Sequence, residues 1–160
     1  MQLTEDKERM TDNYKRKITF LEGDALSLCS PGTWGYKFYQ LNPKASDRVF
    51  ESNQYDGLCN QNILDYLKEV GAKTLIITGV YTSRLVDTTV RSAATRGYDV
   101  FVPIDLVAAA KEMENEHVAA LTIMNTLFAY VVVSDYVIDV WNKKEGIETP
   151  STLKKFLGIR

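Results

Sequence analysis

The segment from residue 74 to residue 91 constrains the fold of this chain more than any other. Residues 75–78 form a β-branched apolar run that ends at Gly79, and apolar residues return at helical spacing from Ser83. A buried parallel strand that turns tightly into a helix produces this pattern. In open α/β sheets, such turns at the carboxyl ends of strands bind ligands and display nucleophiles. The display position here holds Leu85, whose side chain carries no chemistry.

Strands and helices alternate along the rest of the chain. The predicted strands cover residues 47–52, 73–78, 98–103 and 130–133, and the predicted helices cover residues 60–70, 83–96, 111–127 and 134–141. We expect Val49 and Phe50 to form the core of the first strand. This alternation predicts a parallel sheet with right-handed crossovers. We therefore expect one α/β domain over residues 1–160, with a three-layer α/β/α, Rossmann-like fold and a mostly parallel sheet.

The two ends of the chain have patterns of their own. Residues 1–20 are dense in charges of both signs, which predicts an exposed helix or a loosely held arm. This charged start also predicts that no signal peptide is present. Residues 143–160 predict a tail helix, because Thr149 is a suitable N-cap and Pro150 suits the first helical position.

Composition excludes several classes of function. The chain has 160 residues, enough to bury a core without disulfides, and its net charge of −2 gives no footprint for nucleic acid. No apolar run approaches membrane-spanning length. Cys29 and Cys59 lack C-x-x-C spacing, which favours reduced thiols over a disulfide or zinc site. Because G-x-G-x-x-G is absent, we expect no dinucleotide or other cofactor. A cytoplasmic protein without nucleic-acid or membrane partners is the expectation.

Several motifs occur together in a characteristic order. Residues 31–35 read Pro-Gly-Thr-Trp-Gly, residues 77–81 read Ile-Thr-Gly-Val-Tyr, and residues 96–105 lead from Arg-Gly-Tyr-Asp-Val into Val-Pro-Ile-Asp. His117 and Leu121 follow on the helix before the last core strand. From about residue 21 to residue 137 the chain resembles the isochorismatase-like hydrolases, which include nicotinamidases and related amidases. The resemblance implies the α/β fold of that family without its first strands.

The resemblance also implies where catalytic residues belong. In the cysteine hydrolases of this family, an aspartate from the first strand, a lysine and a cysteine form the catalytic group. The ammonium group and the helix N-terminus lower the thiol pKa, and the aspartate accepts and returns the proton. The cysteine position here is Leu85, the lysine position is Ser52, and the aspartate has no counterpart. The resemblance therefore implies an N-terminally truncated member that lacks the catalytic residues.

Two features of the family keep activity in question. True isochorismatases act on a vinyl ether without a cysteine and use the aspartate as proton donor. In the family, backbone N–H groups at the positions of Tyr81 and Leu85 point at the developing oxyanion. A non-proline cis peptide at Val80–Tyr81 fits that turn. The alternative is an ordinary helix N-terminus, which donates N–H groups in any case.

A set of residues around the turn defines the candidate pocket. Its members are Ser52, Tyr55, Leu58, Tyr81, Arg84 and Leu85. Arg84 could clamp a carboxylate, although an arginine in a first helical turn is more often solvated or salt-bridged. No intact catalytic residue is present at the family positions.

Three further residues have a chemical and a structural interpretation. Cys59 is either a displaced nucleophile or, more commonly for its type, a small buried hydrophobe. Asp105 follows a strand and is either a general base or an N-cap. His117 has only Glu114 at metal-ligand spacing, so we expect a helix-surface or interface histidine and no metal site.

Strand 73–78 raises a question of pairing. Without the first strand of the family, its outward ladder groups lack partners, each at a cost of about 1–3 kcal/mol. Either segment 47–52 pairs directly with strand 73–78, or another chain fills the gap. An unpaired apolar edge is a pairing surface. We therefore expect a homo-oligomer or a partner subunit that covers this edge.

Three hypotheses about function follow. The first is a catalytically impaired structural or regulatory subunit, or a small-molecule binding module. The second is an active hydrolase of a small amide or vinyl ether, whose acid/base group is displaced or supplied by a partner chain. The third is a fragment of a longer enzyme, whose missing front end would restore the aspartate alone.

Overall fold

The computed structural model describes residues 2–3, 10–22 and 29–143. The predicted tail helix near residues 149–157 lies outside these residues. The sequence predicts a charged arm or helix over residues 1–20. The helix found there, α1 (Asp12–Glu22), begins at Asp12, and Met10 just before it is buried.

A three-stranded parallel sheet forms the centre of the molecule. Its strands are β3 (Thr74–Ile76), β5 (Asp99–Pro103) and β7 (Tyr130–Val132), in the order β3-β5-β7. Two short parallel pairs lie outside this sheet. β4 (Gly79–Val80) pairs with β6 (Val107–Ala108), and β1 (Gln2–Leu3) pairs with β2 (Glu51–Ser52).

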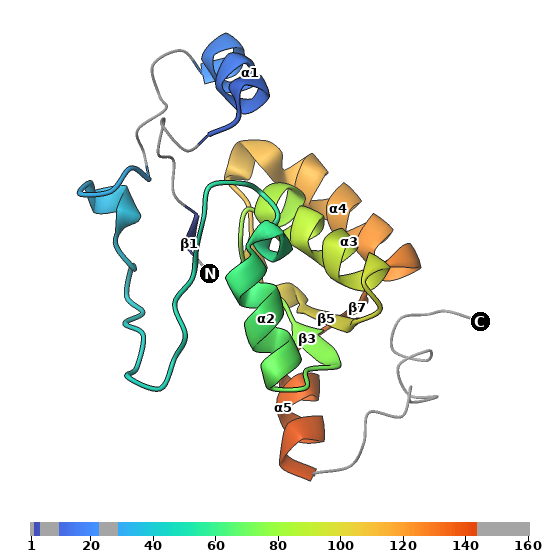
Figure 1. Cartoon of the computed structure of the whole chain (residues 1–160). Coiled ribbons are helices and arrows are strands. Elements are labelled where there is room, and N and C mark those ends of the chain that lie inside the picture. The colour runs from blue at the N-terminus through green and yellow to red at the C-terminus, as the bar shows by residue number, and fades with distance from the viewer. Residues whose placement is uncertain (1, 4–9, 23–28, 144–160) are drawn as a thin grey trace.

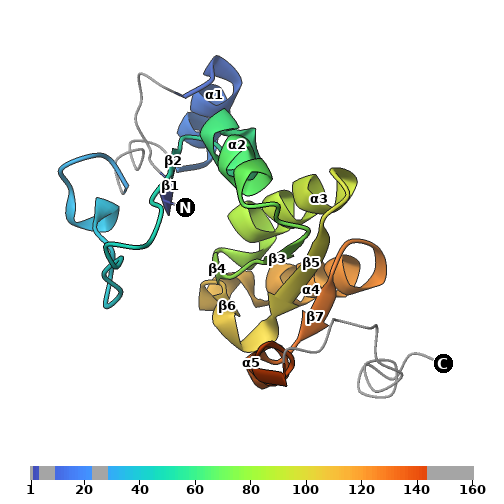
Figure 2. The same cartoon turned by 60° about the horizontal axis from the view of Figure 1, so that its bottom comes forward.

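Helices cover both faces of the sheet. The elements α2 (Gln61–Glu69), α3 (Asp87–Thr95) and α4 (Glu114–Leu127) pack on one face, and α5 (Ser134–Lys143) packs on the other. Figure 2 shows α2 and α5 on opposite sides of the sheet. This is the predicted three-layer α/β/α arrangement.

Short helical segments connect these elements. Their bounds are Trp34–Tyr36, Gly57–Cys59, Ile104–Leu106 and Lys111–Met113, all 3-10 in type, and Thr82–Val86, which is a π-helix. Local sequence sets the ends of α2. The Asn60 side chain accepts a hydrogen bond from the Asn62 N–H (3.0 Å), which caps the helix start. Gly71 ends the helix at φ +65°, a conformation that glycine adopts without strain.

The main core lies between the sheet and helices α2 to α4. Val90 and Ala93 of α3, Val102 of β5 and Met124 of α4 are fully excluded from solvent. A smaller core on the opposite face joins Phe101 and Val132 to α5. Neighbouring residues of β5 therefore point into different cores, Val102 into the main core and Phe101 into the smaller one, as expected for a sheet covered on two faces.

The predicted strand over residues 47–52 is largely wrong. Only Glu51–Ser52 is extended in a ladder, and Val49 is 49% exposed, whereas Phe50 packs against the main core and the Tyr66 ring. A turn at Lys44–Asp47, closed by hydrogen bonds in both directions, keeps the preceding chain out of the sheet. β2 pairs with β1 and not with β3, so direct pairing of segment 47–52 with strand 73–78 is also wrong.

The strand over residues 73–78 forms, but it is not buried on both faces. Leu75 and Ile77 pack against the main core, whereas Ile76 is 44% exposed. Among the described strands, only β5 pairs with β3. The apolar run alone could not reveal this, because it looks the same whether one face or two are covered.

Candidate functional site

The turn after β4 is the candidate site, and its backbone has an unusual geometry. The Val80–Tyr81 peptide is cis, which confirms the prediction from the resemblance. Gly79 has φ +126°, a backbone conformation that residues other than glycine rarely adopt. The chain then enters the π-helix Thr82–Val86 and continues as α3. Wide π turns of this kind occur frequently at functional sites.

Thr82 anchors the turn from within the protein. Its side chain is fully buried, and its hydroxyl donates a hydrogen bond to the Ala108 carbonyl of β6 (3.0 Å). The same hydroxyl oxygen lies 2.8 Å from Nδ1 of His117 on α4. Because Thr82 has one proton and gives it to Ala108, Nδ1 of His117 donates its hydrogen to the Thr82 hydroxyl oxygen.

This role of His117 differs from the sequence prediction. The sequence suggested a surface or interface histidine, and the structure makes it a support of the turn. A polar residue on a helix that precedes the last strand was the available signal. Its partner is 35 positions away, a pairing that local spacing does not reveal.

Two backbone donors of the turn converge on one carbonyl, and one buried hydroxyl has no partner among the described residues. The N–H groups of Arg84 and Val86 both donate to the Tyr81 carbonyl, at 3.1 and 3.3 Å. The N–H of Leu85, between them, does not donate to that carbonyl. The Ser83 hydroxyl is buried without a partner in this part of the chain. The Ser83 hydroxyl is therefore available for a ligand, and a helix N-terminus favours an anion or a carbonyl oxygen.

Arg84 and Tyr81 form the exposed side of the turn. The Arg84 guanidinium lies 5.3 Å from the centre of the Tyr81 ring, a cation–π distance. Tyr81 is 39% exposed, and Leu85 is half-buried between these residues and the core. The position where the family displays its nucleophile thus holds a hydrocarbon side chain.

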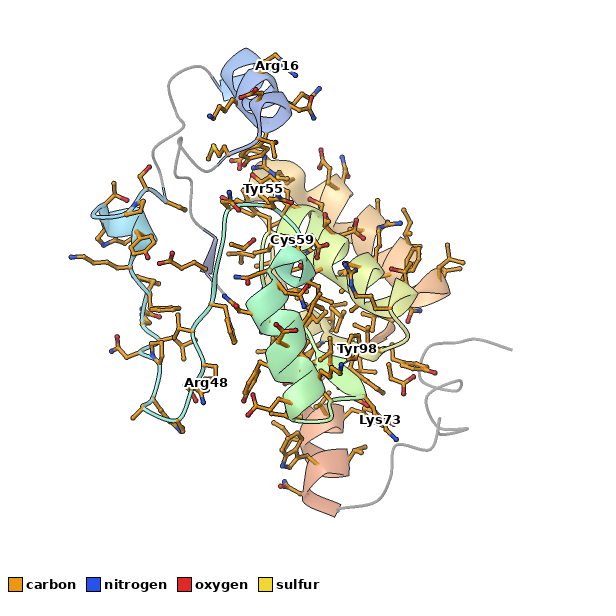
Figure 3. The ribbon with its side chains drawn as sticks, in the orientation of Figure 1. Arg16, Arg48, Tyr55, Cys59, Lys73 and Tyr98 are labelled. Atoms are coloured by element: carbon orange, nitrogen blue, oxygen red, sulfur yellow. The ribbon has the colours of Figure 1, made fainter. Side chains whose placement is uncertain are left out.

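The remaining pocket candidates form a second group around the segment Gly57–Cys59. Ser52 is buried, and its hydroxyl donates to the Gln54 carbonyl (3.0 Å). Cys59 is exposed, with its Sγ 3.7 Å from the Ser52 Oγ, so the expectation of a buried cysteine is wrong. It lies just before the N-terminal end of α2 (Figure 3).

Tyr55 and Leu58 complete this second group. Tyr55 contacts α1 through a hydroxyl–hydroxyl hydrogen bond to Tyr14 (2.8 Å) and an edge-to-face ring contact. Leu58 is 3% exposed and belongs to the same core cluster as Val86, so it packs inward. The structure therefore brings Tyr81, Arg84 and Leu85 together, and Ser52 with Cys59. Both groups adjoin the main core, the first through Val86 and the second through Leu58.

Asp105 lies at the end of β5 and caps α5. Its carboxylate accepts hydrogen bonds from the backbone N–H of Ser134 (2.8 Å) and from the Ser134 hydroxyl. These two bonds lower the pKa of the Asp105 carboxyl below its ordinary value. A carboxylate held in this way is a weak proton acceptor, which argues against a general base. The sequence suggested an N-cap of the segment around Asp105, whereas the helix start that this carboxylate bonds to lies 29 positions further along the chain.

Residues 2–3, 10–22 and 29–143 contain neither a metal-ligand cluster nor a membrane-spanning helix. No group of three or more histidine, cysteine or acidic side chains is close enough to hold a metal ion there. In the same residues, no helix is both long and apolar enough to span a membrane.

Sequence comparison gives a match over most of the chain. Residues 7–135 match the family model described as the isochorismatase domain. Nicotinamidase 3 of Arabidopsis thaliana is 30% identical over 89 residues, which cover 56% of this chain and 43% of that protein. The ureidoacrylate amidohydrolase RutB of Methylobacterium radiotolerans is 32% identical over 105 residues, which cover 65% of this chain and 40% of that protein. The chain thus spans less than half the length of these two relatives.

Solved structures show the same fold. An isochorismatase-like hydrolase from Alkaliphilus metalliredigens is 28% identical with a TM-score of 0.66, and the match covers 73% of this chain and 64% of that one. A cysteine hydrolase from Pseudomonas syringae pv. phaseolicola has a TM-score of 0.74 at 18% identity, over 90% of this chain and 71% of that one. At that identity the second likeness concerns the fold alone.

Proposed function

This chain belongs to the isochorismatase family, and we propose on that premise that it is a catalytically impaired member that binds a small carbonyl or carboxylate compound. The observation that carries the proposal is the presence of Leu85 at the family's nucleophile position. Its side chain cannot attack a carbonyl, whereas its backbone N–H stays in the first turn of the helix whatever the side chain is. Oxyanion stabilisation needs backbone donors and no particular side chain. The binding half of the site is therefore separable from the chemical half.

Ser52 supports the same proposal from the second group. In the cysteine hydrolases a lysine ammonium lowers the thiol pKa, but Ser52 is a short, buried hydroxyl that already bonds to Gln54. It brings no positive charge to the turn. A chain with neither the thiol nor the ammonium lacks both parts of the activated nucleophile.

Turnover assays on the purified chain test this proposal. The substrates are nicotinamide, ureidoacrylate and isochorismate, which sample the amides and vinyl ether of the family. We expect no turnover above the blank, and saturable binding of at least one of these compounds or its carboxylate product by calorimetry. The proposal is overturned by turnover that disappears in a Tyr81→Ala or Arg84→Ala variant. The exposed change Glu116→Ala is the matched control.

Cys59 provides an alternative, an active hydrolase with a displaced nucleophile. Its thiol is exposed and lies 3.7 Å from the hydroxyl of Ser52, the residue that stands where the family has its lysine. Alkylation of Cys59, followed in parallel with turnover, distinguishes the two functions. Equal loss of thiol and activity, repeated by Cys59→Ser but not by Cys29→Ser, supports the alternative. Labelling of Cys59 without any measurable activity supports the impaired binding module.

A further inference from the structure

The short helical segment Gly57–Cys59 is attached to α3 through its backbone. The N–H of the buried Gly57 donates to the Thr89 hydroxyl oxygen (2.9 Å), which joins two positions 32 residues apart. A buried N–H needs an acceptor inside the protein. Thr89 supplies that acceptor, so the segment can lie directly against the helix that follows the turn.

Asp56 joins the shape of this segment to its attachment. One carboxylate oxygen, Oδ1, accepts from the Leu58 N–H (2.8 Å), which caps the start of the segment. The other oxygen, Oδ2, accepts from the Ser92 hydroxyl of α3 (2.7 Å), 36 positions away. The Leu58 side chain is 3% exposed and belongs to the main core. The segment is therefore held by hydrogen bonds to α3 and by one apolar side chain in the core.

The attachment points lie on the side of α3 that also carries Leu85. Thr89 is four residues after Leu85, and Ser92 is three residues after Thr89. This spacing places side chains next to one another along one face of a helix. As the segment advances from Asp56 to Gly57, its contact on α3 moves toward the helix start, from Ser92 to Thr89. One further turn in this direction leads to Leu85.

We propose that Asp56 and Thr89 are positioning residues that hold the Cys59 thiol opposite the Leu85 side chain. The turn and the segment then form the two walls of one cleft. A compound whose carbonyl or carboxylate oxygen binds at the turn places its remaining atoms between a hydrocarbon and a thiol. Because a cysteine side chain behaves as a small hydrophobe, the cleft favours compounds whose remaining part is uncharged. The ligand part of this inference rests on the proposed function, whereas the placement of Cys59 does not.

Cross-linking tests the placement of Cys59 without any ligand. The Leu85→Cys variant, made in a Cys29→Ser background, is treated with a short bis-maleimide. We expect a product that links positions 59 and 85 within one chain, detected by mass spectrometry. Thr88→Cys is the matched control and should give little linked product, because Thr88 is exposed and lies one position away from the face that carries Thr89.

Thr89→Val, added to the cross-linking variant, tests the positioning role. The change keeps the shape of the side chain but removes the acceptor of the Gly57 N–H, so cross-linking should slow about tenfold. Asp56→Ala should act in the same direction. Thr89→Ser retains the hydroxyl and should restore the rate, and Thr88→Val should leave it unchanged, with folding of each variant checked by circular dichroism. The absence of a linked product, or an unchanged rate in Thr89→Val, would overturn the proposal.

Thiol protection tests the ligand part with nicotinamide, ureidoacrylate and isochorismate. A compound that binds at the turn should slow alkylation of Cys59 in the wild-type chain, with Cys29 as the internal reference. In Thr89→Val the same compound should still shift the Leu85 N–H signal but should no longer protect Cys59. Binding that leaves Cys59 alkylation unchanged would contradict the shared cleft. If none of the compounds binds, the proposed function fails, and cross-linking still decides the placement of Cys59.

Discussion

Thr82 and Leu85 stand three residues apart on one turn, and their environments differ completely. Thr82 is fully buried, and its hydroxyl contacts both β6 and α4. Leu85 is only half-buried, and its side chain is chemically inert. The interactions that shape the turn therefore do not involve the position where a reactive side chain would stand. A scaffold built in this way keeps its geometry when the reactive group is lost.

The largest effect is expected from Thr82→Val. The substitution keeps the shape of the side chain but removes the hydroxyl that bonds to the Ala108 carbonyl and to Nδ1 of His117. We expect a loss of about 1–3 kcal/mol in the free energy of unfolding, measured by urea denaturation. The exposed change Thr88→Val on α3 should stay within about 0.5 kcal/mol of wild type. Equal effects of the two changes would contradict the anchoring role of Thr82.

A smaller effect is expected from His117→Ala. This change removes one hydrogen bond and leaves Thr82 free to donate to Ala108, so the loss should be about 0.5–1.5 kcal/mol. The double variant with Thr82→Val should lose less than the sum of the two single changes, because both act on the same contact. Strict additivity in this cycle would show that the two side chains act independently.

Asp105→Ala should have an effect that depends on pH. The Asp105 pKa is lowered from 3.8 in the folded chain, so its contribution to stability is fully present above that value. The contribution is lost as the pH falls through the lower, folded-state pKa. Denaturation of wild type and variant should therefore differ at neutral pH and converge in acid. A difference that stays constant across this range would contradict the capping role.

The sequence predicts most of the α/β/α fold because burial repeats along each element. The helical spacing of Ile63, Leu64 and Leu67 predicts α2, and Gly71 marks its end. The partner of each strand is harder to predict. Residues 75–78 offer apolar or β-branched side chains to both faces of the sheet. Nothing in that pattern reveals that the Ile76 side chain is exposed.

The candidate site was predictable only in part. The cis peptide at Val80–Tyr81 followed from the family resemblance, because the Gly-Val-Tyr turn is local. The contact between Thr82 and His117 was missed, since it joins elements distant in sequence. Exposure of Cys59 was missed because residue type alone favours burial, and only the three-dimensional arrangement leaves the start of α2 open.

The Leu85 amide signal in a ¹⁵N–¹H NMR titration tests the central claim most directly. The titrants are the amide, vinyl-ether and carboxylate compounds of the turnover assay, added to the wild-type chain. The account predicts a saturable shift of the Leu85 N–H signal with at least one of them, while the compound itself remains unchanged. Conversion of the compound would contradict the account, as would a Leu85 signal that none of the compounds moves.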